Sequence, residues 1–117
     1  SYQQREENYA HQQPGVEWNR EALLNFYKPW KDLADKGCKV HIGEAGCFNR
    51  VSNDIALEWY KDFFSVCNEL GFGFALWNFR GSFGIAEHGR EGTNWEIKDG
   101  IRFDKDLCKL FKDAMLQ

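Results

Sequence analysis

The segment 72–77 constrains the fold of this chain more than any other feature, because its sequence Phe-Gly-Phe-Ala-Leu-Trp is entirely apolar. A strand without polar alternation is typical of a parallel sheet that is covered on both faces. A second strand is predicted at residues 38–42, where Val40 and Ile42 are β-branched. The glycines of the following segment 43–46 are expected to end that strand. The sequence therefore predicts two parallel strands.

A helix is predicted at residues 18–36, where apolar side chains recur at steps of three and four. Asn19 is a suitable N-cap for this helix. Pro29 lies inside the segment, so a kink or a split is expected near Tyr27. Gly37 is expected to end the helix, because glycine readily adopts the left-handed conformation that follows a helix.

Two further helices are predicted, at residues 53–70 and 104–115, and both show an apolar face. Gly71 is expected to end the first of them. The segment 78–101 is rich in glycine and is predicted to be a long loop. Residues 1–15 are polar and rich in glutamine, and they also predict a loop. The resulting alternation of strands and helices indicates an α/β fold.

A parallel sheet of only two strands leaves a hydrogen-bonding edge open on each strand. We therefore expect the 117 residues to be a fragment, a swapped oligomer or one piece of a larger sheet. The length itself fits a single domain.

Composition excludes several classes of function. Lys and Arg number 15 against 18 Asp and Glu, and this acidic balance argues against a nucleic-acid partner. No apolar run approaches the roughly 18 residues of a membrane span. The four cysteines are widely spaced without a CxxC pair, so neither a zinc site nor any other metal site is expected. They are interpreted as mostly free thiols that are partly buried.

Glu44 is the first candidate for chemistry, because it follows the predicted strand 38–42 in the sequence Gly-Glu-Ala-Gly. In parallel α/β sheets the carboxyl ends of the strands form the active face. A catalytic carboxylate is one interpretation. The alternative is a glutamate that orders its own loop or pairs with a neighbouring arginine.

Trp77 stands at the end of the next strand and is therefore expected on the same rim as Glu44. An indole beside a carboxylate suits sugar binding, because the apolar face of a pyranose stacks on an aromatic ring. The alternative is a buried core tryptophan. That core assignment is given to the remaining tryptophans, which are Trp18, Trp30, Trp59 and Trp95.

The Gly-Glu-Ala-Gly motif and the later run Gly-Phe-Ala-Leu-Trp-Asn-Phe-Arg-Gly-Ser-Phe-Gly-Ile, residues 73–85, resemble the C-terminal portion of glycoside hydrolase family 5. These are cellulase-like enzymes with a (β/α)8 TIM barrel, and the resemblance covers about residues 27–116. It implies that residues 1–117 are the C-terminal part of one barrel domain. The elements would be helix 6, strand 7, helix 7, strand 8 and helix 8.

The resemblance also assigns roles to residues. Glu44 matches the catalytic nucleophile at the end of strand seven, and Trp77 matches the tryptophan that floors the −1 sugar subsite. Tyr2 or His11 matches substrate-site residues after strand six, with a plain surface loop as the alternative. The general acid/base glutamate of the family, which follows strand four, has no counterpart in this chain.

The function implied by the resemblance is hydrolysis of a β-linked oligo- or polysaccharide by a retaining mechanism. Such a mechanism needs two carboxyl groups about 5–5.5 Å apart and no cofactor. This chain would supply the nucleophile, and the remaining barrel segments would supply the acid/base, so the chain alone is expected to be inactive. The alternatives are a non-catalytic carbohydrate-binding protein and a purely structural barrel fragment.

Overall fold

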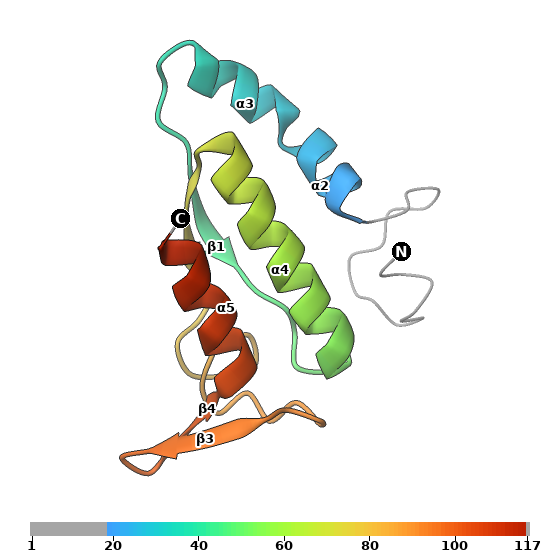
Figure 1. The fold of residues 1–117 in the computed structure, drawn as a ribbon, viewed down its shortest axis with the longest axis vertical. Helices are drawn as coiled ribbons and strands as arrows, with labels where there is room; N and C mark the ends of the chain where they lie inside the picture. The colour runs from blue at the N-terminus through green and yellow to red at the C-terminus, as the bar shows by residue number, and fades with distance from the viewer. Residues whose placement is uncertain (1–18, 117) are drawn as a thin grey trace.

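The computed structural model describes residues 19–116 (Figure 1). In chain order the elements are α2 (Arg20–Phe26), α3 (Lys28–Asp35), β1 (His41–Ala45), α4 (Asn53–Leu70), β2 (Gly73–Leu76), β3 (Trp95–Lys98), β4 (Ile101–Asp104) and α5 (Lys105–Met115). The α/β alternation expected around the first two strands is confirmed, since α4 connects β1 to β2 and the two strands pair in parallel.

The first strand begins and ends later than residues 38–42, so that prediction is wrong at both ends. β1 continues through Gly43, which was expected to end it, and Ile42 still pairs with Phe74. The register shifts between Ile42 and Ala45, and Ala45 then pairs with Leu76. A bulge of this kind lets a glycine-containing segment stay in a sheet while the chain changes direction.

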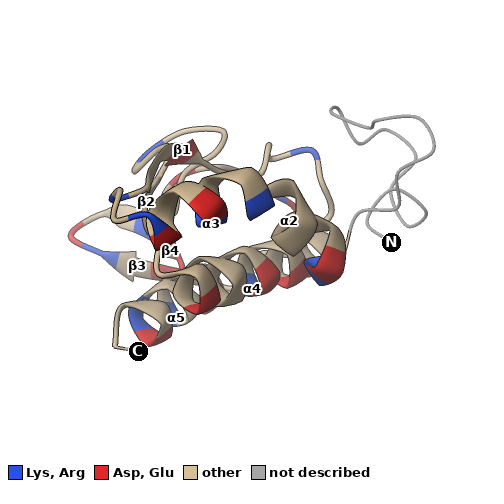
Figure 2. Cartoon of the chain, turned by 90° about the horizontal axis from the view of Figure 1, so that it is seen from above, with Lys and Arg blue, Asp and Glu red and all other residues tan. Residues whose placement is uncertain are grey.

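The sheet is open within the described residues. No other strand of segment 19–116 pairs with β1 or β2. Figure 2 shows α4 and α5 together on one side of the two strands. The expectation that the segment 72–77 is buried on both faces is not met in this part of the chain: Phe72 is buried, but Gly73 is exposed and the other residues of β2 are half-buried.

The core is formed by one face of α4, which packs against α5, α2 and the sheet. Its buried members on α4 are Ile55, Ala56, Tyr60, Phe63, Phe64, Val66 and Cys67. Phe64 stacks on Phe74 of β2 with ring centroids 5.2 Å apart, which fixes the helix against the strand. Burial of each large apolar side chain contributes about 1.5–3 kcal/mol to folding. The predicted bounds of α4 are confirmed, and Gly71 ends it with φ of +70°.

The predicted split of the N-terminal helix is also confirmed. α2 ends at Phe26, Tyr27 separates the helices, and Pro29 lies in the first turn of α3. The Asn19 side chain accepts a hydrogen bond of 2.9 Å from the first turn of α2, as expected for an N-cap. Gly37 follows α3 with φ of +96°.

The prediction that residues 78–101 form a loop is wrong at its C-terminal end. β3 and β4 form an antiparallel hairpin in which Lys98 pairs with Ile101. The two turn residues, Asp99 and Gly100, both have positive φ, as a type I′ turn requires. The sequence Asp-Gly between alternating apolar residues is a strong hairpin signal. The last helix begins one residue later than predicted, with Asp104 as its N-cap.

Two of the tryptophans assigned to the core are half-buried, and each stacks on or packs against another ring. Trp59 stacks on Phe63, and Trp95 packs against His88 with ring centroids 4.7 Å apart. The assignment is wrong for Trp30, which is 44% exposed on α3. Trp18 lies outside the described residues. The prediction of free thiols is confirmed, with Cys47 and Cys67 buried.

Candidate active site

Glu44 and Trp77 lie at the carboxyl ends of adjacent parallel strands. Glu44 is the penultimate residue of β1 and is exposed. Trp77 directly follows β2, and its backbone N–H donates a 2.8 Å hydrogen bond to the carbonyl of Ala45. The ladder therefore continues to the last residue of β1 and one residue beyond β2. This hydrogen bond places Ala45, the residue after Glu44, beside the backbone of Trp77 on the predicted rim.

A close backbone contact holds this rim together at Gly46. A Cβ atom at Gly46 would lie 2.3 Å from the carbonyl oxygen of Trp77 and 3.1 Å from that of Phe83. Only glycine permits this approach, because any side chain would overlap with backbone that cannot move aside. The segment after Glu44 is thus packed directly on the segment that carries Trp77. The Trp77–Asn78 peptide bond is cis.

The Trp77 residue is 52% exposed, so it is not a core residue of the described part of the chain. Its indole therefore has free surface on which another ring can stack. Glu44 and Trp77 are thus both exposed at the carboxyl ends of two adjacent strands. Within residues 19–116, no group of three or more His, Cys, Asp or Glu side chains is arranged to hold a metal ion.

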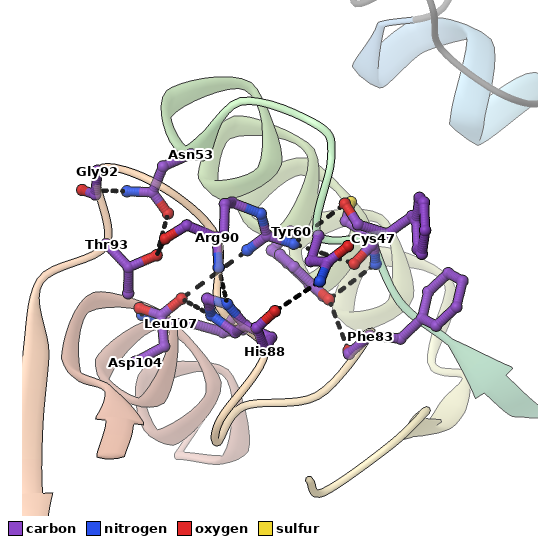
Figure 3. A network of polar contacts seen from close by, with 12 residues as sticks. Cys47, Asn53, Tyr60, Phe83, His88, Arg90, Gly92, Thr93, Asp104 and Leu107 are labelled. Atoms are coloured by element: carbon purple, nitrogen blue, oxygen red, sulfur yellow. Dashed lines mark hydrogen bonds and ion pairs between the residues drawn. The ribbon is translucent and has the colours of Figure 1, made fainter. Parts of the chain in front are cut away.

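A buried polar cluster lies behind the rim and consists of His88, Arg90 and Asp104 (Figure 3). His88 Nε2 lies 2.9 Å from Asp104 Oδ2, and Arg90 Nη1 lies 4.0 Å from the same oxygen. The Arg90 backbone N–H donates to His88 Nδ1 at 2.9 Å. Because Nδ1 accepts, the ring proton resides on Nε2 and is donated to Asp104. A neutral histidine, one carboxylate and one guanidinium give a charge-balanced cluster.

Two buried side chains hold the backbone of Cys47, which comes three residues after Glu44. The Tyr60 hydroxyl accepts from the Cys47 N–H at 2.8 Å and donates to the Phe83 carbonyl at 3.3 Å. Arg90 Nη2 donates to the Cys47 carbonyl at 3.0 Å. Burial raises the pKa of the Tyr60 phenol and raises that of the Cys47 thiol to about 12. Both groups therefore keep their protons at neutral pH.

A cleft of about 1310 Å³ lies between the segments 48–54 and 89–92. Its lining includes Phe48, Arg50 and Arg90, but neither Glu44 nor Trp77. In the described part of the chain, the two candidate residues therefore lie on an open rim, outside this cleft.

Comparison with known proteins gives this arrangement a context. A crystal structure of a glycoside hydrolase matches with a TM-score of 0.83 and 45% identity, over 91% of this chain and 33% of that protein. A solved endoglucanase matches with a TM-score of 0.55 and 26% identity, over 62% of this chain and 26% of its own. Endoglucanase C of Acetivibrio thermocellus is 30% identical over 63 residues, which are 53% of this chain and 18% of that enzyme. No model of a known protein family matches.

The chain resembles a portion of the cellulase-like glycoside hydrolases of family 5. Its solved relatives are TIM-barrel enzymes, and it spans only about a third of the length of the first of them, with 33% covered. Thermotoga maritima Cel5A, solved in complex with mannotriose, shares the fold at 18% identity and a TM-score of 0.61, over 82% of this chain and 30% of its own. The open two-stranded sheet is thus one portion of a larger architecture in the relatives.

Two further candidate site residues, Tyr2 and His11, lie outside the described residues. Sequence reasoning missed the polar side chains behind the rim. The apolar pattern of residues 53–70 predicts only a packing role for Tyr60, and His88 and Arg90 fall within the segment 78–101 that is predicted to be a loop. Asp104 carried a usable signal, because an aspartate directly before an amphipathic helix is a typical N-cap. Its carboxylate accepts a 3.1 Å hydrogen bond from the first turn of α5.

Proposed function

We propose that this chain is the C-terminal part of a (β/α)8 glycoside hydrolase that cleaves a β-glycan with retention of configuration. In this proposal α2 and α3 together are helix 6 of the barrel, β1 and β2 are strands 7 and 8, and α4 and α5 are helices 7 and 8. Glu44 is the nucleophile, and Trp77 provides the aromatic face on which the sugar ring bound beside Glu44 stacks. This chain and the segments that complete its sheet together form what we call the assembled barrel.

One observation carries the proposal: a carboxylate and a half-exposed tryptophan at the carboxyl ends of two adjacent parallel strands. This is the face on which TIM-barrel enzymes place their catalytic residues. The similarity to a glycoside hydrolase at 45% identity and to endoglucanases supports glycans as the substrate class. The open edges of β1 and β2 are the positions where the completing strands would pair.

The chemistry follows from the roles of two carboxyl groups. Glu44 attacks the anomeric carbon, and the glycosidic bond breaks as the second carboxyl group protonates the leaving oxygen. A glycosyl ester on Glu44 results. The second group, now a carboxylate, removes a proton from water, which attacks the anomeric carbon and releases Glu44. The second carboxyl group belongs to the segments that complete the barrel.

A trapping experiment tests the proposal. The assembled barrel is incubated with 2,4-dinitrophenyl 2-deoxy-2-fluoro-β-cellobioside, whose fluorine slows release of the sugar from the enzyme. We expect a fluorocellobiosyl group on the peptide that contains Glu44, detected by mass spectrometry after proteolysis. A label on another carboxylate, or binding of cello-oligosaccharides without any label or turnover, would overturn the proposed role of Glu44. The second result would favour a non-catalytic carbohydrate-binding protein.

Trp77→Ala should weaken binding of cello-oligosaccharides to the assembled barrel while leaving its stability nearly unchanged. The substitution deletes a stacking face that is already half-exposed. The expected loss is roughly 1–3 kcal/mol, the scale measured for nucleic-acid bases that stack on aromatic side chains. Isothermal titration calorimetry gives the affinity, and Trp30→Ala is the control, because Trp30 is also exposed but lies on α3. Unchanged affinity with a collapsed melting temperature would show that Trp77 is structural.

The isolated 117-residue chain should neither hydrolyse glycans nor unfold as a cooperative monomer. Its sheet has only two strands with unpaired edges in the described region, and a sheet of that size is marginally stable. Sedimentation should show association, and calorimetry should show no sharp transition. A monomer with a single sharp melting transition would contradict the proposal that other segments complete this fold.

A further inference from the structure

The backbone of Cys47 is held by side chains from two distant parts of the chain, and this residue connects β1 to the loop that leads into α4. Its N–H donates to Tyr60 of α4, and its carbonyl accepts from Arg90 of the loop that precedes β3. Tyr60 is fully buried, and the Arg90 side chain is only 2% exposed. Both backbone polar groups of one loop residue are thus fixed by buried partners, which is an unusual degree of restraint for a connecting segment.

The Tyr60 hydroxyl also connects the two strand ends to each other. It accepts from Cys47 on the β1 side and donates to the Phe83 carbonyl on the β2 side (Figure 3). Between these bonds, Gly46 packs against the carbonyls of Trp77 and Phe83. A single hydroxyl therefore sets the distance between the segment that follows Glu44 and the segment that follows Trp77.

Arg90 is itself held by other contacts, so its hydrogen bond keeps the Cys47 carbonyl in a defined position. Its carbonyl accepts from the Thr93 hydroxyl at 2.8 Å, and its N–H is held by His88. Arg90 Nη1 lies 4.0 Å from Asp104 Oδ2, and the Asp104 side chain caps α5. The guanidinium thus links the loop after Glu44 to the start of the last helix.

We propose that Tyr60 and Arg90 are positioning residues for the catalytic pair, holding the Glu44 carboxylate in place relative to the Trp77 ring. The inference rests on the proposed function and deepens it, because neither residue touches substrate. Tyr60 acts through the Cys47 N–H and the Phe83 carbonyl, and Arg90 acts through the Cys47 carbonyl. Loss of either should displace Glu44 from the anomeric carbon more than it alters the binding of the sugar chain.

The test compares Tyr60→Phe with Tyr27→Phe in the assembled barrel. The first change removes one hydroxyl and its two hydrogen bonds while keeping the ring in the core. The second removes a hydroxyl from a half-buried tyrosine that packs against Phe72, before β2 begins. With 4-nitrophenyl β-cellobioside as the probe, Tyr60→Phe should lower kcat by about tenfold to a hundredfold, the scale of a 1 Å misplacement. KM should stay within about threefold, because ground-state binding is retained. Tyr27→Phe should leave both constants unchanged.

Arg90→Lys is a second variant that keeps a cation beside Asp104. The single ammonium group of lysine replaces a guanidinium whose two terminal nitrogens contact Cys47 and Asp104. A fall in kcat smaller than that of Tyr60→Phe is therefore expected, again with little change in KM. All rates are measured well below the melting temperature of each variant, where a purely structural role would leave kcat unchanged.

Two results would overturn the positioning role, and a third variant separates it from the proposed function. Unchanged kcat in both Tyr60→Phe and Arg90→Lys would overturn it, as would an equal fall in kcat in Tyr60→Phe and Tyr27→Phe. Glu44→Gln is measured beside them. If Glu44→Gln abolishes turnover while neither Tyr60→Phe nor Arg90→Lys reduces it, only the positioning role fails. If Glu44→Gln retains turnover, the proposed function itself fails.

Discussion

Glu44→Gln should abolish turnover in the assembled barrel while cello-oligosaccharides still bind. Glutamine keeps the shape of the side chain but cannot form the glycosyl ester on which a retaining mechanism depends. Removal of a nucleophile costs several orders of magnitude in kcat, on the order of 10⁶ where all the chemistry passes through it. Because Glu44 is exposed near the carboxyl end of β1, its replacement by a neutral isostere should leave the melting temperature nearly unchanged.

The measurement combines kcat on 4-nitrophenyl β-cellobioside with calorimetric binding of cellotetraose. Glu69→Gln is the matched control: Glu69 is an exposed glutamate on α4 that pairs with Arg20 at 3.1 Å. That pair is on the surface, so its loss should change neither activity nor stability appreciably. Turnover by Glu44→Gln within tenfold of the parent would show that another residue is the nucleophile.

The part of the fold that sequence predicted well is the part decided by local pattern. The helix at Asn53–Leu70 has a continuous apolar stripe and a glycine at its end, and both its bounds were predicted correctly. The split at Tyr27 followed from the fixed φ and missing N–H of the nearby Pro29. The parallel pairing of β1 and β2 followed from the helix between them and the apolar character of the second strand.

The errors arose where pairing overrides residue preference. Gly43 is a poor strand residue, yet β1 continues through it because a bulge in the register is tolerated beside a partner strand. The hairpin of β3 and β4 lay in a segment that its glycines marked as a loop, although Asp99-Gly100 is a turn signal. The glycines of this segment favour a loop, whereas the alternation of apolar residues on either side of Asp99-Gly100 favours a hairpin.

In the candidate site, too, local sequence identifies some residues, while only the tertiary packing reveals the others. Glu44 and Trp77 were identified because a position at the end of a parallel strand can be inferred from local sequence. Their proximity then follows from pairing in parallel. The cluster behind them was beyond such reasoning, because His88 and Asp104 are separated by 16 positions and aspartate is a residue type that is mostly exposed. Only the packing of a loop against α5 shows that they are buried together.

Asp104→Ala should destabilise the assembled barrel severely, by about 3–5 kcal/mol in the free energy of unfolding. Asp104 is fully buried. Its carboxylate accepts a hydrogen bond from His88 Nε2–H and faces the guanidinium of Arg90. Its removal leaves Arg90 as an uncompensated buried charge, which carries a cost of this size. It also removes the N-cap of α5, which alone contributes about 0.5–2 kcal/mol.

Urea unfolding of the assembled barrel measures this loss, and two variants separate its causes. Asp113→Ala removes an exposed aspartate of the same helix whose partner, Lys109, lies one turn away, so it should cost about 0.3–0.5 kcal/mol. Asp104→Asn keeps an oxygen for the cap but removes the charge, so its loss should fall between those of the two alanine variants. If Asp104→Ala and Asp113→Ala shift the urea midpoint equally, the buried cluster contributes nothing beyond a surface pair. Losses of the same size for Asp104→Asn and Asp104→Ala would instead assign the whole effect to the lost charge, leaving the cap without a measurable contribution.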